Sequence, residues 1–136
     1  MMNKDWFEWY GEQKSKQTRW AMFRDRYLCP CCYMPTLTER RGDDICPICF
    51  WEDDGQDTDD EKIVRGGPNK DYSLREARDN FKKFMTMYRK EDTKYFEREQ
   101  KRIAEIMNLY NAFTRAIITN TENDWNEAIN LQEQIP

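Results

Sequence analysis

All five cysteines of the chain lie between residues 29 and 49, and this cluster constrains the fold more than any other feature. Cys29 and Cys32 form one C-x-x-C pair, Cys46 and Cys49 form another, and 13 residues separate the pairs. Each C-x-x-C turn directs two sulfurs toward a common centre, and two such turns complete a tetrahedral four-thiolate zinc site. The sequence therefore predicts one structural Zn²⁺ ion, bound by Cys29, Cys32, Cys46 and Cys49.

Two alternatives stay open at this site. Cys31 is the cysteine left over, because adjacent residues cannot easily place both sulfurs at one ion; a ligand set with Cys31 in place of Cys32 would shorten the first chelate to C-x-C. Iron is an alternative to zinc, because a tetrahedral cage of four sulfurs suits both metals. Metal binding is favoured over disulfides because the N-terminus lacks a signal-peptide pattern, which predicts a cytoplasmic protein in a reducing environment.

The spacer between the cysteine pairs predicts a two-stranded hairpin. Thr36 to Thr38 suit a strand, Arg41-Gly42-Asp43 suits a turn, and Asp44-Ile45 leads back to the second pair. Proline follows the first cysteine of each pair, at positions 30 and 47, and stiffens both turns.

Helical spacing dominates the rest of the chain. It occurs near the N-terminus, after the capping box that Ser73 opens, over about residues 93–118, and after Thr121. The apolar positions that carry it are Trp6, Trp9, Tyr10, Trp20, Phe23, Tyr27, Ala77, Phe81, Phe84, Tyr88, Phe96, Ile103, Met107, Tyr110, Phe113, Ile117, Trp125, Ala128 and Ile129. The expected fold is mostly α with a small zinc-ribbon-like β-hairpin module, flanked by an N-terminal helix and C-terminal helices. We expect a single domain over 1–136, made of a helical segment (1–26), the zinc module with an acidic loop (27–72) and a helical region (73–136).

Charge is distributed unevenly over the chain. The net charge is −4, but residues 43–61 hold nine acidic residues and no basic one. Such a block repels nucleic acid and attracts basic partners, although a solvated loop has the same composition. We predict a docking surface for a basic protein, formed by Glu52, Asp53, Asp54, Asp57, Asp59, Asp60 and Glu61.

Catalysis is not expected. The chain has no histidine, which removes the commonest general base. A closed four-thiolate site leaves the metal no open position for water or substrate. Cys31 is the one candidate nucleophile, and nothing in the sequence supplies the base that would activate it.

Four motifs in the chain resemble a known family. CPCC at 29–32, CPICFWEDD at 46–54, GGPN at 66–69 and SLREARDNF at 73–81 resemble the cysteine-rich CPCC family of small bacterial proteins, over about residues 27–84. The resemblance implies a cysteine-rich metal-binding module followed by the helix after Ser73, and it implies no particular activity.

These observations favour a non-enzymatic zinc-binding protein-interaction module. Size and acidic charge suggest an immunity or inhibitor-type protein that binds a basic partner such as a toxin or nuclease. The alternative is a zinc-ribbon protein that binds nucleic acid or assists transcription or translation, because residues 62–102 hold 13 basic residues, with seven acidic ones interspersed.

Overall fold

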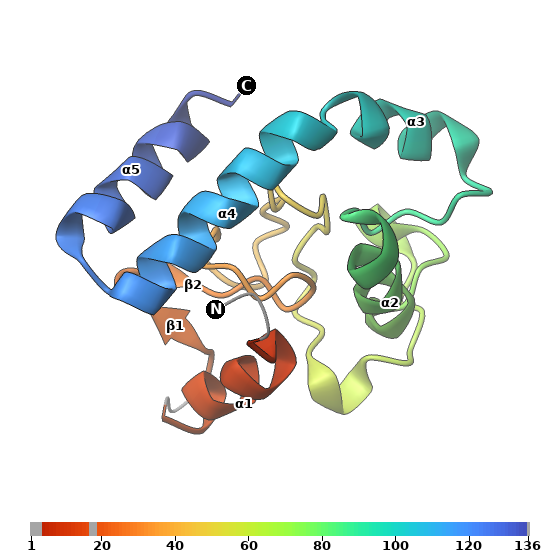
Figure 1. The fold of residues 1–136 in the computed structure, drawn as a ribbon. Helices are drawn as coiled ribbons and strands as arrows, with labels where there is room; N and C mark the ends of the chain where they lie inside the picture. The colour runs from red at the N-terminus through yellow and green to blue at the C-terminus, as the bar shows by residue number, and fades with distance from the viewer. Residues whose placement is uncertain (1–3, 17–18, 136) are drawn as a thin grey trace.

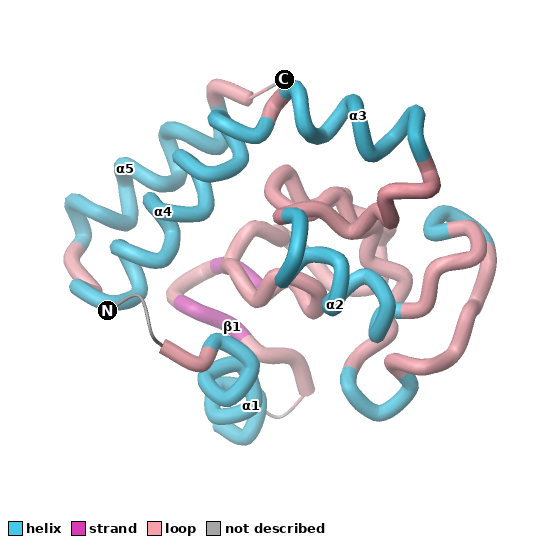
Figure 2. The backbone as a smooth tube through the Cα atoms, turned by 45° about the vertical axis from the view of Figure 1, so that its right-hand side comes forward, coloured by secondary structure: helices cyan, strands magenta, loops and turns pink. Residues whose placement is uncertain are grey.

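The computed structural model describes residues 4–16 and 19–135 and consists mainly of helices around a central cysteine-rich segment (Figure 1). That segment is almost entirely loop, as Figure 2 shows. The regular elements are α1 (Trp6–Lys16), β1 (Met22–Phe23), β2 (Arg26–Tyr27), α2 (Leu74–Phe84), α3 (Thr93–Lys101), α4 (Ile103–Thr119) and α5 (Glu122–Glu133), with two 3₁₀ turns at Thr58–Asp60 and Gly67–Asn69. The predicted class, mostly α with a small β-hairpin and a four-cysteine cluster, is confirmed.

The hairpin lies before the cysteines and not between them. β1 and β2 pair antiparallel, with Met22 opposite Tyr27, and Arg24 turns the chain with a φ of 53°. The prediction of helix over Trp20 to Tyr27 is therefore wrong, and within residues 4–16 and 19–26 only α1 is helical. Phe23 and Tyr27 lie in the two strands of the hairpin and pack against the core. Their positions in the sequence therefore matched helical spacing although the segment is not a helix.

The predicted strand pairing within the spacer is also wrong. Leu37 pairs with Tyr27, and Ile45 pairs with Glu52, as isolated antiparallel bridges. Each bridge therefore joins the residues on the two sides of one cysteine turn, and no bridge joins the two ends of the described spacer to each other.

The helix after Ser73 begins as predicted. The Ser73 hydroxyl accepts a hydrogen bond from the Glu76 N–H at 3.0 Å, which caps α2. The helix ends at Phe84, because Met85 adopts the left-handed conformation with a φ of 60°. Tyr88 therefore lies beyond the helix that was predicted to contain it, and its ring centroid lies 6.2 Å from that of Phe50.

The long helix predicted over 93–118 is divided into two. α3 and α4 meet at Arg102, which has a φ of −102° and a ψ of 14°. α4 then runs beside α5 (Figures 1 and 2), and the two helices share an edge-to-face contact between Phe113 and Trp125 at 5.9 Å. This pair belongs to the same hydrophobic core as the cysteines.

No helix within 4–16 and 19–135 combines the length and the apolar character that crossing a membrane requires. The single-domain organisation over 1–136 stays a prediction.

Candidate metal centre

Four cysteine sulfurs converge in the core. The Sγ atoms of Cys29, Cys32, Cys46 and Cys49 all lie within 4.8 Å of one another. The Cys29–Cys49 and Cys32–Cys46 sulfur pairs are each 3.6 Å apart. A tetrahedral zinc ion with Zn–S bonds of about 2.3 Å requires sulfurs about 3.8 Å apart. The four residues predicted from sequence therefore form a group whose size fits one tetrahedral metal ion.

The two cysteine turns are geometrically equivalent, and we call them the first knuckle (residues 29–32) and the second knuckle (residues 46–49). The Tyr33 N–H donates to the Cys29 carbonyl at 2.8 Å, and the Phe50 N–H donates to the Cys46 carbonyl at 2.9 Å. Tyr33 and Phe50 both have left-handed φ angles, 72° and 74°. An aromatic residue rarely adopts this conformation. The shared conformation therefore marks two copies of one motif, C-P-x-C-aromatic; the sequence alone indicated its cysteines and proline but not the role of the aromatic residue.

An arginine is bound to the proline carbonyl of each knuckle. Arg78 of α2 donates to the Pro30 carbonyl at 2.8 Å, and Arg102 donates to the Pro47 carbonyl at 3.0 Å. Each arginine also pairs with a glutamate, Arg78 with Glu61 at 2.8 Å and Arg102 with Glu99 at 2.7 Å. These contacts hold the knuckles against α2 and the α3–α4 junction.

The cysteine thiols cannot all ionise without a cation. Burial raises the pKa of the Cys29, Cys32 and Cys49 thiols, because a thiolate is poorly solvated in the core. Burial acts in the same direction on Cys46, but hydrogen bonds from the other three thiols outweigh it and lower the pKa of Cys46. Without a cation, the site therefore disfavours four thiolates. A divalent cation supplies the charge that lets all four become thiolates.

Two polar groups contact the sulfurs directly. The Thr36 hydroxyl donates to the Cys46 sulfur at 3.1 Å, and the Cys31 N–H donates to the Cys29 sulfur at 3.4 Å. Such donors orient metal ligands and spread their charge. Thr36 had been interpreted only as a strand residue; its position between the knuckles was the one signal that could have indicated this role.

Cys31 is buried with the other cysteines but is not one of the four converging sulfurs. We therefore expect Cys31→Ser to leave one metal ion per chain, whereas a ligand set that used Cys31 would lose metal. Elemental analysis of the purified variant beside the native chain measures this. A metal content reduced by half or more in Cys31→Ser would show that Cys31 is a ligand.

The acidic segment is neutralised largely by the chain itself. Asp53 is fully buried, and its carboxylate accepts from the Arg40 side chain at 2.9 Å and from the Arg41 N–H at 2.6 Å. Arg40, a residue of the spacer, has a side chain only 1% exposed, and its guanidinium lies 4.2 Å from the centroid of the Trp20 ring. Asp53 is thus not available to a partner, and that part of the predicted docking surface is wrong.

Asp57 is the second acidic residue in the interior. It accepts hydrogen bonds from the Tyr10 hydroxyl at 2.9 and 3.0 Å and pairs with Lys14 at 3.3 Å. Although burial acts to raise the pKa of Asp57, the Thr58 N–H, Lys14, Tyr10 and Arg40 together hold it below its ordinary value. The carboxylate joins α1 to the acidic segment, so Asp57 is also wrongly placed in the predicted surface.

The other five acidic residues are more accessible. Asp59 is exposed, and Glu52, Asp54, Asp60 and Glu61 are half-buried. Arg65 pairs with Asp60 at 2.6 Å and approaches Asp54 at 3.9 Å, while Glu61 pairs with Arg75 and Arg78. Among the described residues, five of the nine acidic residues of 43–61 therefore form ion pairs within the chain: Asp53, Asp54, Asp57, Asp60 and Glu61.

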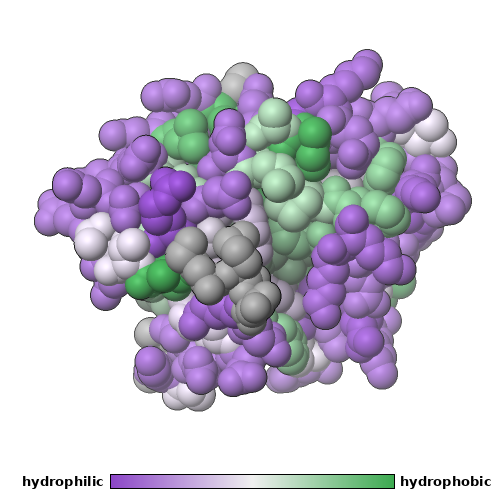
Figure 3. Space-filling view, viewed as in Figure 1, coloured by the Kyte–Doolittle hydropathy of each residue, from purple (hydrophilic) through white to green (hydrophobic). Residues whose placement is uncertain are grey.

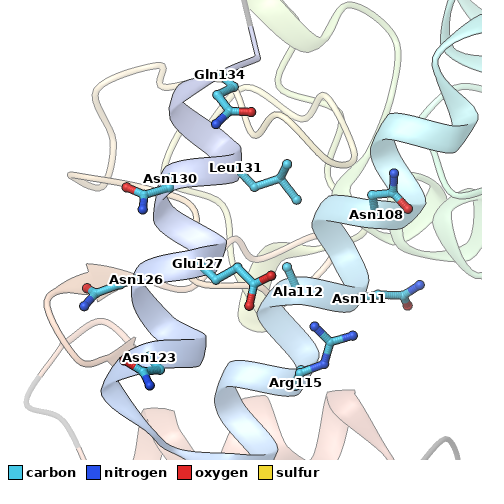
Figure 4. A pocket seen from close by; sticks show the side chains of 10 residues that line it. All are labelled: Asn108, Asn111, Ala112, Arg115, Asn123, Asn126, Glu127, Asn130, Leu131 and Gln134. Atoms are coloured by element: carbon cyan, nitrogen blue, oxygen red, sulfur yellow. The ribbon is translucent and has the colours of Figure 1, made fainter.

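A separate groove of about 600 Å³ lies on the outer side of α4 and α5 (Figure 4). The lining residues come from both helices and are mostly amides, with Arg115 and Glu127 among them. The amides are Asn108, Asn111, Asn123, Asn126, Asn130 and Gln134. The groove is remote from the cysteines in sequence, and it lacks the aromatic walls that characterise small-molecule sites.

Comparison with known proteins agrees with the cysteine motifs. The family model described as Cysteine-rich CPCC matches residues 27–102, from the start of the first knuckle to the α3–α4 junction. The match covers just over half of the chain and extends beyond the resemblance predicted over 27–84. No curated protein and no solved structure matches the chain.

Proposed function

The chain belongs to the cysteine-rich CPCC family, and we propose that its four converging cysteines bind one structural Zn²⁺ ion in a non-enzymatic binding protein. The observation that carries the proposal is the 3.6 Å spacing within both sulfur pairs at a site whose ligands are no more than 1% exposed. A buried four-thiolate site is closed, and a closed site is typical of structural zinc. When bound, the ion supplies positive charge that joins the two knuckles.

The same burial argues against catalysis. Cys31, the fifth cysteine, is 1% exposed and directly precedes the ligand Cys32 in a chain that has no histidine. A nucleophilic cysteine normally lies in a partly exposed, electropositive place where it can meet substrate. We infer that Cys31 is a core residue and that the centre performs no reaction.

Metal content tests the zinc assignment. Chain purified without added metal is expected to contain one zinc per chain by elemental analysis, with no visible absorption. Iron bound to four thiolates would colour the protein and would replace zinc in the proposal. Absence of both metals from a well-folded chain would contradict a structural metal centre of any kind.

A protein-interaction role stays a proposal. A basic toxin or nuclease, bound by an immunity or inhibitor-type protein, would meet Asp59 and the half-buried Glu52, Asp54, Asp60 and Glu61 rather than the whole predicted surface. Reversal of Asp59 to lysine, compared with the native chain in a pull-down at low and high salt, tests this contact, because screening shortens the Debye length from about 10 Å at 0.1 M to about 3 Å at 1 M. Retention of nucleic acid alone would favour the alternative function.

A further inference from the structure

An aromatic pocket lies beside the metal centre, between α1, α2 and α4. It has a volume of about 420 Å³, which is within the range of small-molecule sites. Its walls are the side chains of Trp6, Phe7, Tyr33, Phe81, Met85 and Tyr110, and Cys32 forms part of its lining. Figure 3 shows hydrophobic surface between α2 and α4 on a face that is otherwise mostly hydrophilic.

The walls of this pocket combine rings from four separate parts of the chain. The Phe7 and Tyr33 rings are 5.9 Å apart, and the Phe81 and Tyr110 rings are 5.7 Å apart, both in tilted arrangements. Phe7 is 46% exposed, so part of its ring is in contact with water. An aromatic ligand would therefore make edge-to-face and stacked contacts with these rings, and it would bury apolar surface that water now contacts.

Two lysines border the pocket, and both are exposed. Lys4 and Lys82 form no ion pair among the residues that the structure describes, whereas the neighbouring Arg75 pairs with Glu61 and Asp79. Asp5 also lines the pocket, but its carboxylate accepts the Glu8 N–H at 3.0 Å at the start of α1. Two lysines that form no ion pair with any described residue thus border the aromatic pocket.

We propose that this pocket binds a small aromatic carboxylate, with the ring between the aromatic walls and the carboxylate at Lys82 and Lys4. The size of the cavity favours a free small molecule, and the aromatic walls favour a planar ring over an alkyl chain. This binding activity goes beyond the proposed zinc role and does not depend on which metal the cysteines hold.

Lys82 also has a purely structural explanation, which the test must separate. It lies in the last turn of α2, where a cation interacts favourably with the helix dipole. Lys83 occupies the same turn and is also exposed, but it does not line the pocket. A structural role would be shared by both lysines, whereas a ligand-binding role belongs to Lys82 alone.

The experiment titrates the full metal-loaded chain with 3-phenylpropionate, its neutral amide 3-phenylpropionamide, and acetate. Calorimetry measures the affinities, and two-dimensional amide NMR locates the site. We expect 3-phenylpropionate to shift the Trp6 indole and the Tyr33 and Met85 amide signals. Loss of a charged hydrogen bond costs about tenfold in affinity, so the amide should bind about tenfold more weakly, and acetate should not bind measurably.

Matched variants assign the charge. Lys82→Ala is expected to weaken 3-phenylpropionate about tenfold, and Lys83→Ala is expected to leave its affinity within twofold of native. Equal affinities for the acid and the amide, equal losses in both variants, shifts elsewhere in the chain, or no binding of the acid at millimolar concentration would each overturn the proposal. Tighter binding of a peptide with a C-terminal phenylalanine than of 3-phenylpropionate would overturn the assignment to a free small molecule. Metal content of the same samples shows separately whether the zinc proposal holds.

Discussion

Cys46→Ser is expected to unfold the chain at room temperature. Structural zinc contributes about 10–16 kcal/mol of binding free energy in small zinc domains, and a whole domain is typically stable by about 5–15 kcal/mol. The zinc-binding free energy that is lost with one cysteine ligand is therefore comparable to the whole free energy of unfolding. The four sulfurs lie in the same core as the aromatic residues of α4 and α5, so loss of the metal should affect helices far from the cysteines.

Circular dichroism and zinc content, measured together on Cys46→Ser, check this expectation. Cys31→Ser is the matched control, because it removes a buried thiol of the same size without removing one of the converging sulfurs. A strong chelator added to the native chain should reproduce the effect of Cys46→Ser. A Cys46→Ser chain that melts at the native temperature would contradict a structural role for the metal.

Acid is expected to release the metal, for the same reason. Each metal–thiolate bond requires a deprotonated sulfur, so falling pH lets protons compete with the ion. Asp57 adds to the effect: its pKa is lower in the folded chain than in the unfolded chain, so its stabilising contribution is present above the ordinary carboxyl pKa. That contribution is lost as the pH falls through the lowered value.

The parts of the structure that could be predicted from sequence are those specified by local spacing. Two C-x-x-C pairs indicated the four converging cysteines, and Ser73 and Thr121 marked the starts of α2 and α5. In each case the residues that interact are no more than about 20 positions apart, so the pattern is visible in a short window of sequence.

The features that could not be predicted depend on contacts between distant segments. Arg78 lies 48 residues from Pro30, Arg102 lies 55 residues from Pro47, and Tyr10 lies 47 residues from Asp57. Nothing local distinguishes these arginines from the other basic residues of 62–102. Most positive partners of the acidic segment are likewise on other elements, namely α1, α2 and the spacer, and only Arg65 follows it closely in the sequence.

Arg78→Ala is expected to lower the free energy of unfolding by about 3–5 kcal/mol, the usual cost of leaving a buried ionic network without one partner. The guanidinium is 5% exposed and donates to the Pro30 carbonyl, to Glu61 at 2.8 Å and to the Thr58 hydroxyl at 3.2 Å. Its removal leaves a knuckle carbonyl and a carboxylate without their buried partner. The first knuckle, α2 and the acidic segment would lose their common contact.

Arg75→Ala is the control that distinguishes the effect of burial on stability from the effect of charge. Arg75 lies on the same helix and pairs with the same Glu61, but its side chain is 51% exposed, so its ion pairs are worth about 0–1 kcal/mol. Urea denaturation of both variants measures the difference directly. Arg78→Lys should fall between them, because lysine keeps the charge but lacks the planar fork that reaches three acceptors at once. Equal losses in Arg75→Ala and Arg78→Ala would mean that only net charge matters, and the buried contact with the first knuckle would then contribute nothing to holding the metal centre against α2.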